Sequence, residues 1–394
     1  MPVVSGRVNA AAAAFAGVRD FYFSSRYAER RLAPDVCDFT FGNPHEMPLE
    51  GMVGALRDKL TPRDKNWFAY KTSEREAQEF LAEAVGRELE LAFEPADFAL
   101  TTGAFTAILV AFHLVLDAGD EVIYSEPAWF CYGPMLLGAN CVPAGVPLRR
   151  PNFDLDLAAI EARIGPKTRM VIVNTPHNPT GRIYDRDTLR ELGELLDHAS
   201  KRNGRRIFLL ADEPYRRLRF DGRPFVSPAA LYPWTLISYS WGKVLLAPGQ
   251  RLGYLALSPL MLKEERKALQ EALFSAQMAL GWCFPNAVMQ YAMADLDKLS
   301  IDQQALGRRR DRLMAALAPA GYGVLEPEGT FYLWSRWPEG NPQVLWNRLA
   351  DRDVFVMPGS LMNAPEYFRM CLTASDRMVD RALPALIEAA DIRP

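Results

Sequence analysis

Lys243 is the first residue whose surroundings suggest chemistry. It stands in the sequence SWGK (residues 240–243), directly after an apolar run over residues 235–239. A lysine in a desolvated site loses its proton more readily and can attack a carbonyl carbon as an amine nucleophile. A lone lysine in a loop is more often a solvated charge, so this interpretation depends on what lies around it.

A carboxylate and an amide follow two other apolar runs. Asp212 begins DEPY after the run 207–210, and Asn178 lies in HNPTG after the run 170–173, in a loop stiffened by prolines. Taken alone, each is explained by an ordinary turn. Strands of one parallel sheet end on the same side, however, and ligands bind outside those ends. We therefore expect Asn178, Asp212 and Lys243 to face one ligand.

A strand-to-helix junction rich in small residues occurs in TTGAFT, residues 101–106. Backbone N–H groups at the N-terminus of a helix attract anions, and Gly103, Ala104 and Phe105 would open such a helix. Many turns between a strand and a helix look similar, so this signal is weak by itself.

The elements that must position these residues alternate along the middle of the chain. Apolar runs of strand length alternate with amphipathic stretches of helix length, which is typical of a mostly parallel sheet covered by helices. The strands are expected over residues 98–102, 121–125, 170–174, 207–211, 235–239 and 253–257. The helices are expected over residues 74–88, 105–116, 157–164, 186–202 and 260–279.

The pattern changes near residue 285. Pro285 and Asn286 open a long helical stretch. Short strands are then expected over residues 330–334, 354–356 and 368–372, before a last helix over residues 377–390. We therefore expect an α/β chain with a large domain over residues 46–284. Residues 1–45 and 285–394 are expected to form a smaller α+β domain.

Composition excludes several classes of protein. The 394 residues are 49% hydrophobic and 24% charged with a net charge of −3, so the chain can bury a core and lacks the basic surface of a nucleic-acid-binding protein. No apolar run approaches the ~18 residues of a membrane span. Five scattered cysteines and four histidines suggest neither a disulfide framework nor a metal site. The alanine-rich stretch 9–18 predicts an N-terminal helix, and the protein is expected to be soluble and cytoplasmic.

The motifs taken together are far more specific than any one of them. Asn178, Asp212-x-x-Tyr215, Ser240-x-x-Lys243 and Arg251-x-Gly253 occur in this order. This series resembles the class I/II aminotransferases, which are fold-type I enzymes dependent on pyridoxal phosphate. The resemblance runs from FGNP at residues 41–44 to Arg369, and it implies a large domain with a mostly parallel sheet sandwiched by helices.

The resemblance assigns roles around the ring of the cofactor, pyridoxal 5′-phosphate. Lys243 matches the lysine that forms the Schiff base with the cofactor aldehyde, and Asp212 matches the carboxylate that pairs with the ring nitrogen. Tyr215 and Asn178 match the donors to the phenolic oxygen of the ring. Trp129 matches the aromatic residue that stacks on the ring, although a tryptophan is often simply part of a core.

The resemblance also assigns residues to the two anionic groups. The cofactor phosphate would be bound by the backbone of Gly103, Ala104 and Phe105 and by the side chains of Ser240 and Arg251. Tyr70 lies where the family supplies a tyrosine to the phosphate of the neighbouring subunit, which implies a homodimer with shared active sites. The α-carboxylate of the substrate would be bound by Arg369, with help from Gly42 and Asn178.

The activity expected from the resemblance is the transfer of an amino group from an L-amino acid to a 2-oxo acid, a step of amino acid metabolism. A β-eliminating carbon–sulfur lyase on the same fold is the alternative, because the cofactor-binding residues would be the same. The substrate stays open at this point. Aromatic residues weakly favour a substrate with a large apolar side chain: Phe21, Tyr22, Phe23, Trp129, Phe130, Phe331 and Tyr332. Four arginines could instead include one that binds an acidic side chain of the substrate: Arg19, Arg26, Arg30 and Arg336.

Overall fold

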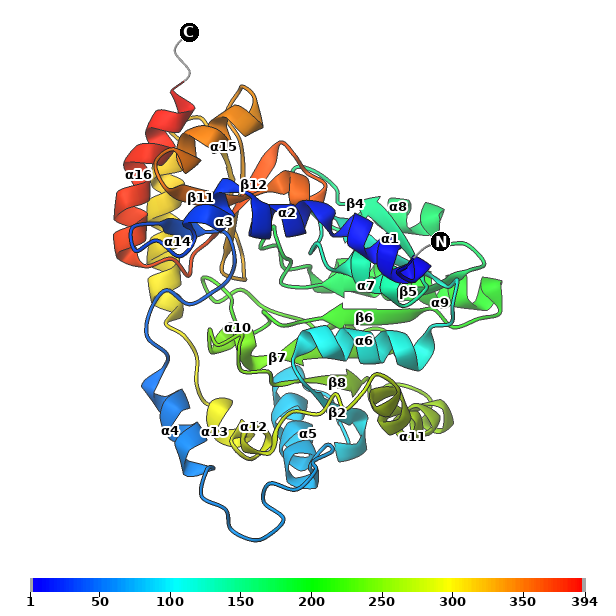
Figure 1. Cartoon of the computed structure of the whole chain (residues 1–394). Coiled ribbons are helices and arrows are strands. Elements are labelled where there is room, and N and C mark those ends of the chain that lie inside the picture. The colour runs from blue at the N-terminus through cyan, green and yellow to red at the C-terminus, as the bar shows by residue number, and fades with distance from the viewer. Residues whose placement is uncertain (1–2, 392–394) are drawn as a thin grey trace.

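The computed structural model describes residues 3–391 and contains two β-sheets (Figure 1). The larger sheet has seven strands in the order β2-β8-β7-β6-β5-β3-β4, and only β8 runs antiparallel to its neighbours. Its strands are β2 (Phe98–Thr101), β3 (Glu121–Glu126), β4 (Val142–Pro147), β5 (Thr168–Asn174), β6 (Phe208–Asp212), β7 (Thr235–Ser240) and β8 (Gly253–Leu257). The expected α/β fold with a mostly parallel sheet is confirmed.

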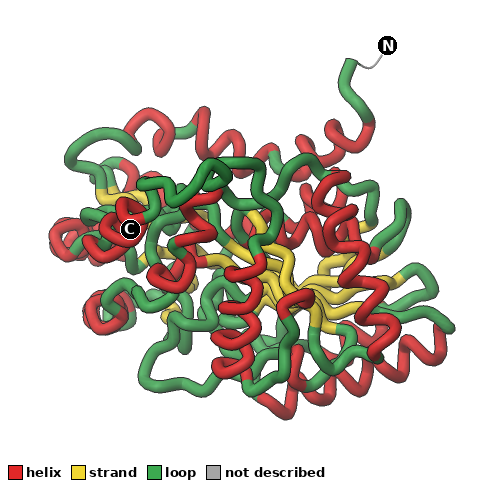
Figure 2. Tube along the Cα trace, turned by 90° about the horizontal axis from the view of Figure 1, so that it is seen from below, coloured by secondary structure: helices red, strands yellow, loops and turns green. Residues whose placement is uncertain are grey.

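Helices cover both faces of this sheet, which lies at the centre of the layers in Figure 2. The strands β6 and β7 are buried along their whole length, which is why their sequences are continuous apolar runs. The surrounding helices are α5 (Arg75–Leu89), α6 (Ala104–Val115), α7 (Tyr132–Gly138), α8 (Leu157–Arg163), α9 (Arg186–Asn203) and α11 (Lys263–Ala279). The helix α9 shows the local rules well, since Asp185 caps its first turn and Gly204 ends it at a φ of 61°.

The smaller sheet has five strands in the order β1-β11-β12-β10-β9. They are β1 (Cys37–Phe39), β9 (Gly323–Leu325), β10 (Tyr332–Arg336), β11 (Val354–Pro358) and β12 (Tyr367–Cys371). Three helices accompany the sheet: α14 (Gln303–Leu317), α15 (Pro342–Ala350) and α16 (Asp376–Ala390). The strand expected over residues 330–334 begins two residues later, because Thr330 has a φ of 70° and cannot extend it.

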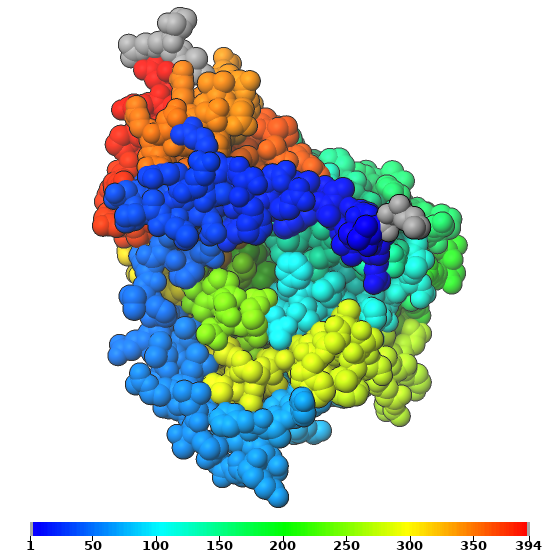
Figure 3. Space-filling model, viewed as in Figure 1, coloured from blue at the N-terminus to red at the C-terminus, as the bar shows by residue number. Residues whose placement is uncertain are grey.

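The N-terminal segment touches both parts of the molecule. Its helices α1 (Gly6–Ala14), α2 (Ala16–Ser24) and α3 (Arg26–Arg30) form the blue band across the face in Figure 3. The helix α1 packs against α7 beside the larger sheet, whereas β1 pairs in parallel with β11 in the smaller one. The stretch 9–18 is helical as expected except at Phe15, where the chain divides into two helices and the Phe15 ring packs against Phe130.

The long helix expected after Pro285 was wrong. This segment forms two short helices, α12 (Ala287–Tyr291) and α13 (Met293–Leu296), which lie near α4 (Glu50–Asp58). The side chain of Gln290 explains the local geometry, because it donates to the carbonyl oxygens of Thr72 and Pro285 and accepts from the Glu74 N–H. Between residues 3 and 391, no helix combines the length and the apolar character needed to cross a membrane.

A buried ion-pair network fixes the loop that follows β6. Arg216 is almost fully buried and pairs with Glu88 of α5 at 2.9 Å and with Glu213 at 3.4 Å. Its guanidinium also lies 4.2 Å from the ring centroid of Tyr239 in β7. Burial raises the pKa of Glu213 to about 7, and the charge of Arg216 opposes that rise. The network therefore ties the carboxyl end of β6 to a neighbouring helix and strand.

Replacing Arg216 should destabilise the protein strongly. Arg216→Met leaves Glu213 buried without a cation, which costs about 3–5 kcal/mol in comparable buried pairs. Thermal unfolding of Arg216→Met should therefore occur at a clearly lower temperature than that of the wild type. The matched control is Arg190→Met, because Arg190 makes only exposed pairs with Asp187 and Glu194 and should change stability by about 0.5 kcal/mol at most. Equal melting temperatures for the two variants would contradict the assignment.

Candidate functional site

A cavity of about 230 Å³ opens where the carboxyl ends of β5, β6 and β7 meet the smaller sheet. Side chains of both sheets line it, including Asp212 of β6 and Arg369 of β12. The structure brings together eleven of the expected residues in its wall: Gly42, Ala104, Phe105, Trp129, Asn178, Asp212, Tyr215, Ser240, Lys243, Arg251 and Arg369. Parallel strands ending at one edge thus assemble residues that are far apart in the sequence.

Asp212 is the buried acid of this cavity. Its Oδ2 accepts a hydrogen bond from the Tyr132 hydroxyl at 2.5 Å, whereas its Oδ1 has no hydrogen-bond partner among the described residues. The side chain of Asn174 donates to the Asp212 backbone carbonyl at 2.8 Å. Burial raises the pKa of Asp212 to about 6, and the hydrogen bond from Tyr132 opposes the rise. An unpaired oxygen in this position is suited to a cationic donor from a ligand.

Lys243 lies in α10 (Trp241–Val244), a single turn that starts where β7 ends. Ser240 fixes the start of this turn, because its Oγ accepts from the Gly242 N–H and donates to the Leu252 carbonyl. The Lys243 Nζ lies 5.6 Å from the ring centroid of Tyr215. No carboxylate within residues 3–391 forms a salt bridge with it, and its Nζ lies near the rings of Tyr215 and Phe331, so the amine is available to a ligand in the cavity.

A candidate anion site lies at the N-terminus of α6. Gly103 precedes this helix with a φ of 92°, and a Cβ there would come within 2.5 Å of the Arg251 guanidinium. A Cβ on Gly253 would likewise lie 2.7 Å from the Gly103 Cα. The two glycines therefore allow the backbone and Arg251 to pack closely. Helix N–H groups and a guanidinium together favour a phosphate-like group.

Arg369 comes from the opposite sheet and is held in a fixed orientation. Its Nη1 donates to the Asn178 Oδ1 and its Nη2 donates to the Thr40 carbonyl, both at 2.8 Å. Its Nε has no partner among the described residues, and its guanidinium lies 4.0 Å from the ring centroid of Tyr332. A buried arginine with a spare donor is suited to binding a carboxylate.

Tyr215 is arranged as a hydrogen-bond donor. Its hydroxyl lies 3.1 Å from that of Tyr332, and burial raises its pKa well above the ordinary value. The hydroxyl therefore stays protonated at neutral pH. Asn178 uses its oxygen for Arg369, which leaves its amide N–H groups for a ligand.

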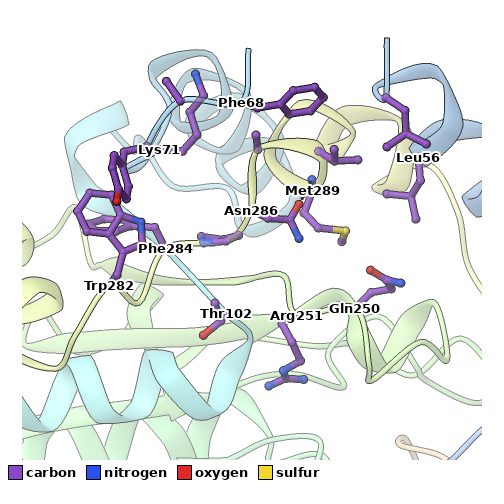
Figure 4. Close-up of a pocket in the computed structure, with 16 residues that line it drawn as sticks. Leu56, Phe68, Lys71, Thr102, Gln250, Arg251, Trp282, Phe284, Asn286 and Met289 are labelled. Atoms are coloured by element: carbon purple, nitrogen blue, oxygen red, sulfur yellow. Dashed lines mark hydrogen bonds between the residues drawn. The ribbon is translucent and has the colours of Figure 1, made fainter. Parts of the chain in front are cut away.

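Two expected residues lie outside the wall of this cavity. Gly103 is directly behind it, packed on Arg251. Tyr70 lines a second cavity of about 1020 Å³, shown in Figure 4, where its side chain is 89% exposed and contacts Trp282 edge to face. Arg251 lines both cavities, and in Figure 4 it lies with Thr102 on the side opposite Phe68 and Leu56. Within one chain, Tyr70 shares the second cavity with Arg251 but does not line the cavity that holds the other site residues.

The comparisons with known proteins agree on one family. Residues 34–386 match the family described as aminotransferase class I and II. The probable aspartate/prephenate aminotransferase of Thermus aquaticus is 29% identical over 365 residues, covering 91% of this chain and 93% of the relative. Kynurenine–oxoglutarate transaminase 1 of Mus musculus is 28% identical over 322 residues, covering 76% and 74%.

Solved structures give the same result. An aminotransferase from Eubacterium rectale superposes with a TM-score of 0.90 at 27% identity, covering 99% of this chain and 98% of that one. The aspartate aminotransferase of Thermus thermophilus with maleate superposes with a TM-score of 0.81 at 26% identity, covering 99% of this chain and 100% of that one.

The chain belongs to the class I and II aminotransferases. It is a transaminase, and the comparisons do not favour the β-eliminating lyase, since the relatives described above are named aminotransferases or transaminases. The resemblance drawn from the sequence motifs is thereby confirmed for the family, the fold and the reaction type.

Three site residues of this aminotransferase escaped the sequence analysis. Tyr132 holds Asp212, Asn174 orients the loop that carries Asn178 by accepting its N–H at 2.7 Å, and Thr40 holds Arg369. The available signals were positional, because Tyr132 comes three residues after Trp129 and Asn174 ends the strand before HNPTG. Neither position reveals its partner, since Tyr132 and Asp212 are 80 residues apart.

The buried charge of Asp212 should make the ligand-free aminotransferase sensitive to pH. Its pKa of about 6 in the folded protein exceeds the ordinary 3.8, so the free energy of unfolding falls as the pH rises from 3.8 to about 6 and stays at the lower value above that. At pH 8 the neutral variant Asp212→Asn should be more stable than the wild type by about 2–3 kcal/mol. Below pH 4 the difference should vanish, and melting temperatures across this range measure it.

The control for this experiment is Asp187→Asn. Asp187 is exposed and pairs only with Arg190 in the described structure, so its replacement should leave the pH profile of stability unchanged. A difference between Asp212→Asn and the wild type that stays constant from pH 4 to pH 8 would show that Asp212 is not a desolvated charge.

Proposed function

We propose that this aminotransferase binds pyridoxal 5′-phosphate in the 230 Å³ cavity and uses it to move the amino group of an L-amino acid to a 2-oxo acid. The observation that carries the proposal is the buried Asp212 Oδ1, which has no partner among the described residues and lies in the same wall as the unpaired Lys243 amine. A protonated ring nitrogen would supply the missing donor. The anion site at the start of α6 would receive the phosphate of the same molecule.

The residues fit the other parts of the cofactor. Trp129 offers an aromatic face, and Tyr215 and Asn178 offer donors for the phenolic oxygen. The phosphate would be bound by backbone groups of Gly103, Ala104 and Phe105 and by the side chains of Ser240 and Arg251. When bound, the cofactor supplies an aldehyde that takes up amino groups and a ring that accepts electrons released at the substrate Cα.

The residues that line the cavity would then each have a defined role. The Lys243 amine would hold the cofactor by its aldehyde and, when free, would take up the proton of the substrate Cα and return it. Asp212 would hold the proton on the ring nitrogen, because its carboxylate is buried and has no cationic partner within hydrogen-bond distance among the described residues. Arg369, the Gly42 backbone and Asn178 bind the α-carboxylate and so place Cα near Lys243.

We propose further that the protein works as a homodimer. Apolar side chains near the 1020 Å³ cavity are exposed in the single chain, namely Leu60, Phe68, Tyr70, Phe274 and Trp282. Exposed apolar surface of this kind favours association. A second copy seated here would bring its Tyr70 towards Arg251 and the phosphate. The cytoplasmic location expected from the composition stays a prediction.

Removal of the Lys243 amine tests the cofactor proposal. Lys243→Ala should lose covalent attachment of pyridoxal phosphate and at least about 1000-fold in turnover, because a nucleophile and a general base are removed together. Reduction with borohydride followed by mass spectrometry of the denatured protein measures attachment. The control Lys267→Ala removes an exposed lysine of α11 and should keep both properties. Attachment that persists in Lys243→Ala would show that another amine binds the cofactor.

The dimer proposal has its own test. Light scattering of the purified protein should give twice the chain mass of 44.2 kDa. Tyr70→Phe should keep this mass but release the cofactor more readily, because one hydrogen bond to the phosphate is lost and such a bond to a charged group contributes about 1.5–3 kcal/mol. A monomer, or unchanged cofactor affinity in Tyr70→Phe, would overturn the shared site.

A further inference from the structure

The charges around the 230 Å³ cavity are few. Among the described residues that line it, the charged side chains are Asp212, Lys243, Arg251 and Arg369. Arg251 lies against Gly103 at the start of α6 and donates to the Pro248 carbonyl, on the side proposed for the phosphate. Arg369 is committed to Asn178 and Thr40, where the α-carboxylate is proposed to bind. None of these cations remains for a second carboxylate.

The four arginines that could have read an acidic side chain lie elsewhere. Arg19, Arg26 and Arg30 form ion pairs with Asp20, Asp351 and Asp353. Arg336 is exposed on β10, with its side chain alongside Gly323. None of the four lines the cavity.

Four aromatic residues stand together in the cavity wall. Phe41 and Phe130 have ring centroids 6.5 Å apart, and Phe105 and Trp129 meet edge to face at 5.1 Å. Trp129 also contacts Phe130 at 6.4 Å, so these four rings form one continuous group, which we call the aromatic wall. Phe105 and Trp129 adjoin the positions proposed for the cofactor, which leaves Phe41 and Phe130 as the rings of the wall without a proposed contact to the cofactor or the α-carboxylate.

The aromatic wall is fixed from behind by the N-terminal segment. Phe41 packs against Phe21, Tyr22 and Tyr27 at centroid distances of 5.4–6.3 Å. Phe130 packs against Phe15 at 6.1 Å. Rings held on two sides keep their positions, so the wall is a preformed surface.

Physical chemistry separates two classes of substrate here. A carboxylate taken from water to this wall without a cation would lose several kcal/mol of solvation. An aromatic ring placed there gains from burial of its apolar area and from edge-to-face contacts. We infer that the amino donor of this aminotransferase carries a large aromatic or apolar side chain, read by Phe41 and Phe130, and not a second carboxylate. This inference rests on the proposed function of the cavity.

The test uses the enzyme loaded with pyridoxal phosphate and compares amino donors with one 2-oxo acid acceptor. The value of kcat/KM for L-phenylalanine should exceed that for L-aspartate by at least about 100-fold. Aspartate or glutamate turned over as fast as phenylalanine would overturn the inference and show that a cation from a second copy reads the side chain. Failure of every amino acid would instead reject the proposed function, so the two failures are distinct.

Variants of Phe130 test whether this residue contacts the side chain of the amino donor. Phe130→Ala should lower kcat/KM for phenylalanine about 10-fold, mainly through KM, while the value for L-alanine stays within about twofold, because alanine does not reach the wall. Phe130→Arg should raise kcat/KM for L-aspartate relative to kcat/KM for L-phenylalanine. The control Phe23→Ala removes an exposed ring and should change neither value. An equal loss for phenylalanine and alanine in Phe130→Ala would show that Phe130 only supports the fold and would reject its role as a reader.

Discussion

A carboxylate buried without a cation is the constraint on which this active site depends. Asp212 ends a strand that is buried along its whole length, and the hydrogen bond from Tyr132 is the largest of the interactions that offset the desolvation of its side chain. The neighbouring charge, Glu213, is compensated by Arg216, which pairs with it and with Glu88. The chain at the end of β6 thus carries two buried acids. Glu213 is paired with an arginine, whereas Asp212 has no salt-bridge partner among the described residues and lines the ligand cavity. The free energy that burial of this charge costs in the ligand-free protein would be recovered when the protonated ring of the proposed cofactor binds beside it.

The second constraint is the meeting of two sheets. The larger sheet supplies Asp212 and Lys243 from the ends of adjacent strands, while Arg369 comes from the smaller sheet. The hydrogen bond from Arg369 to Asn178 crosses from one to the other. A carboxylate bound by Arg369 is therefore positioned relative to residues of the larger sheet, which is what an amino-acid substrate with its reacting atom next to the carboxylate requires.

Much of this arrangement could be predicted because buried parallel strands have largely apolar sequences, which can be recognised along the chain. The runs before Asn178, Asp212 and Lys243 placed all three at one edge, and the strand over 253–257 was predicted at its observed bounds. Contacts between distant residues could not be predicted this way, as Tyr132 and Asp212 show. Local departures from regular backbone structure could not be predicted either. The strand after Thr330 begins later than expected, and the N-terminal helix is divided at Phe15. Gln290 stabilises a loop where a long helix was expected.

The N-terminal segment connects specificity to both sheets. Its rings support Phe41 and Phe130, while Phe105 and Trp129 at the other end of the aromatic wall adjoin the phosphate and ring positions proposed for the cofactor. The same segment packs on α7 and continues into β1 of the smaller sheet. Side-chain recognition is therefore built on elements that also fix the relative position of Arg369 and Asp212. A substrate ring that fills the wall would contact the segment that joins the two sheets, so binding energy from the side chain is available to hold the reacting carbon in place.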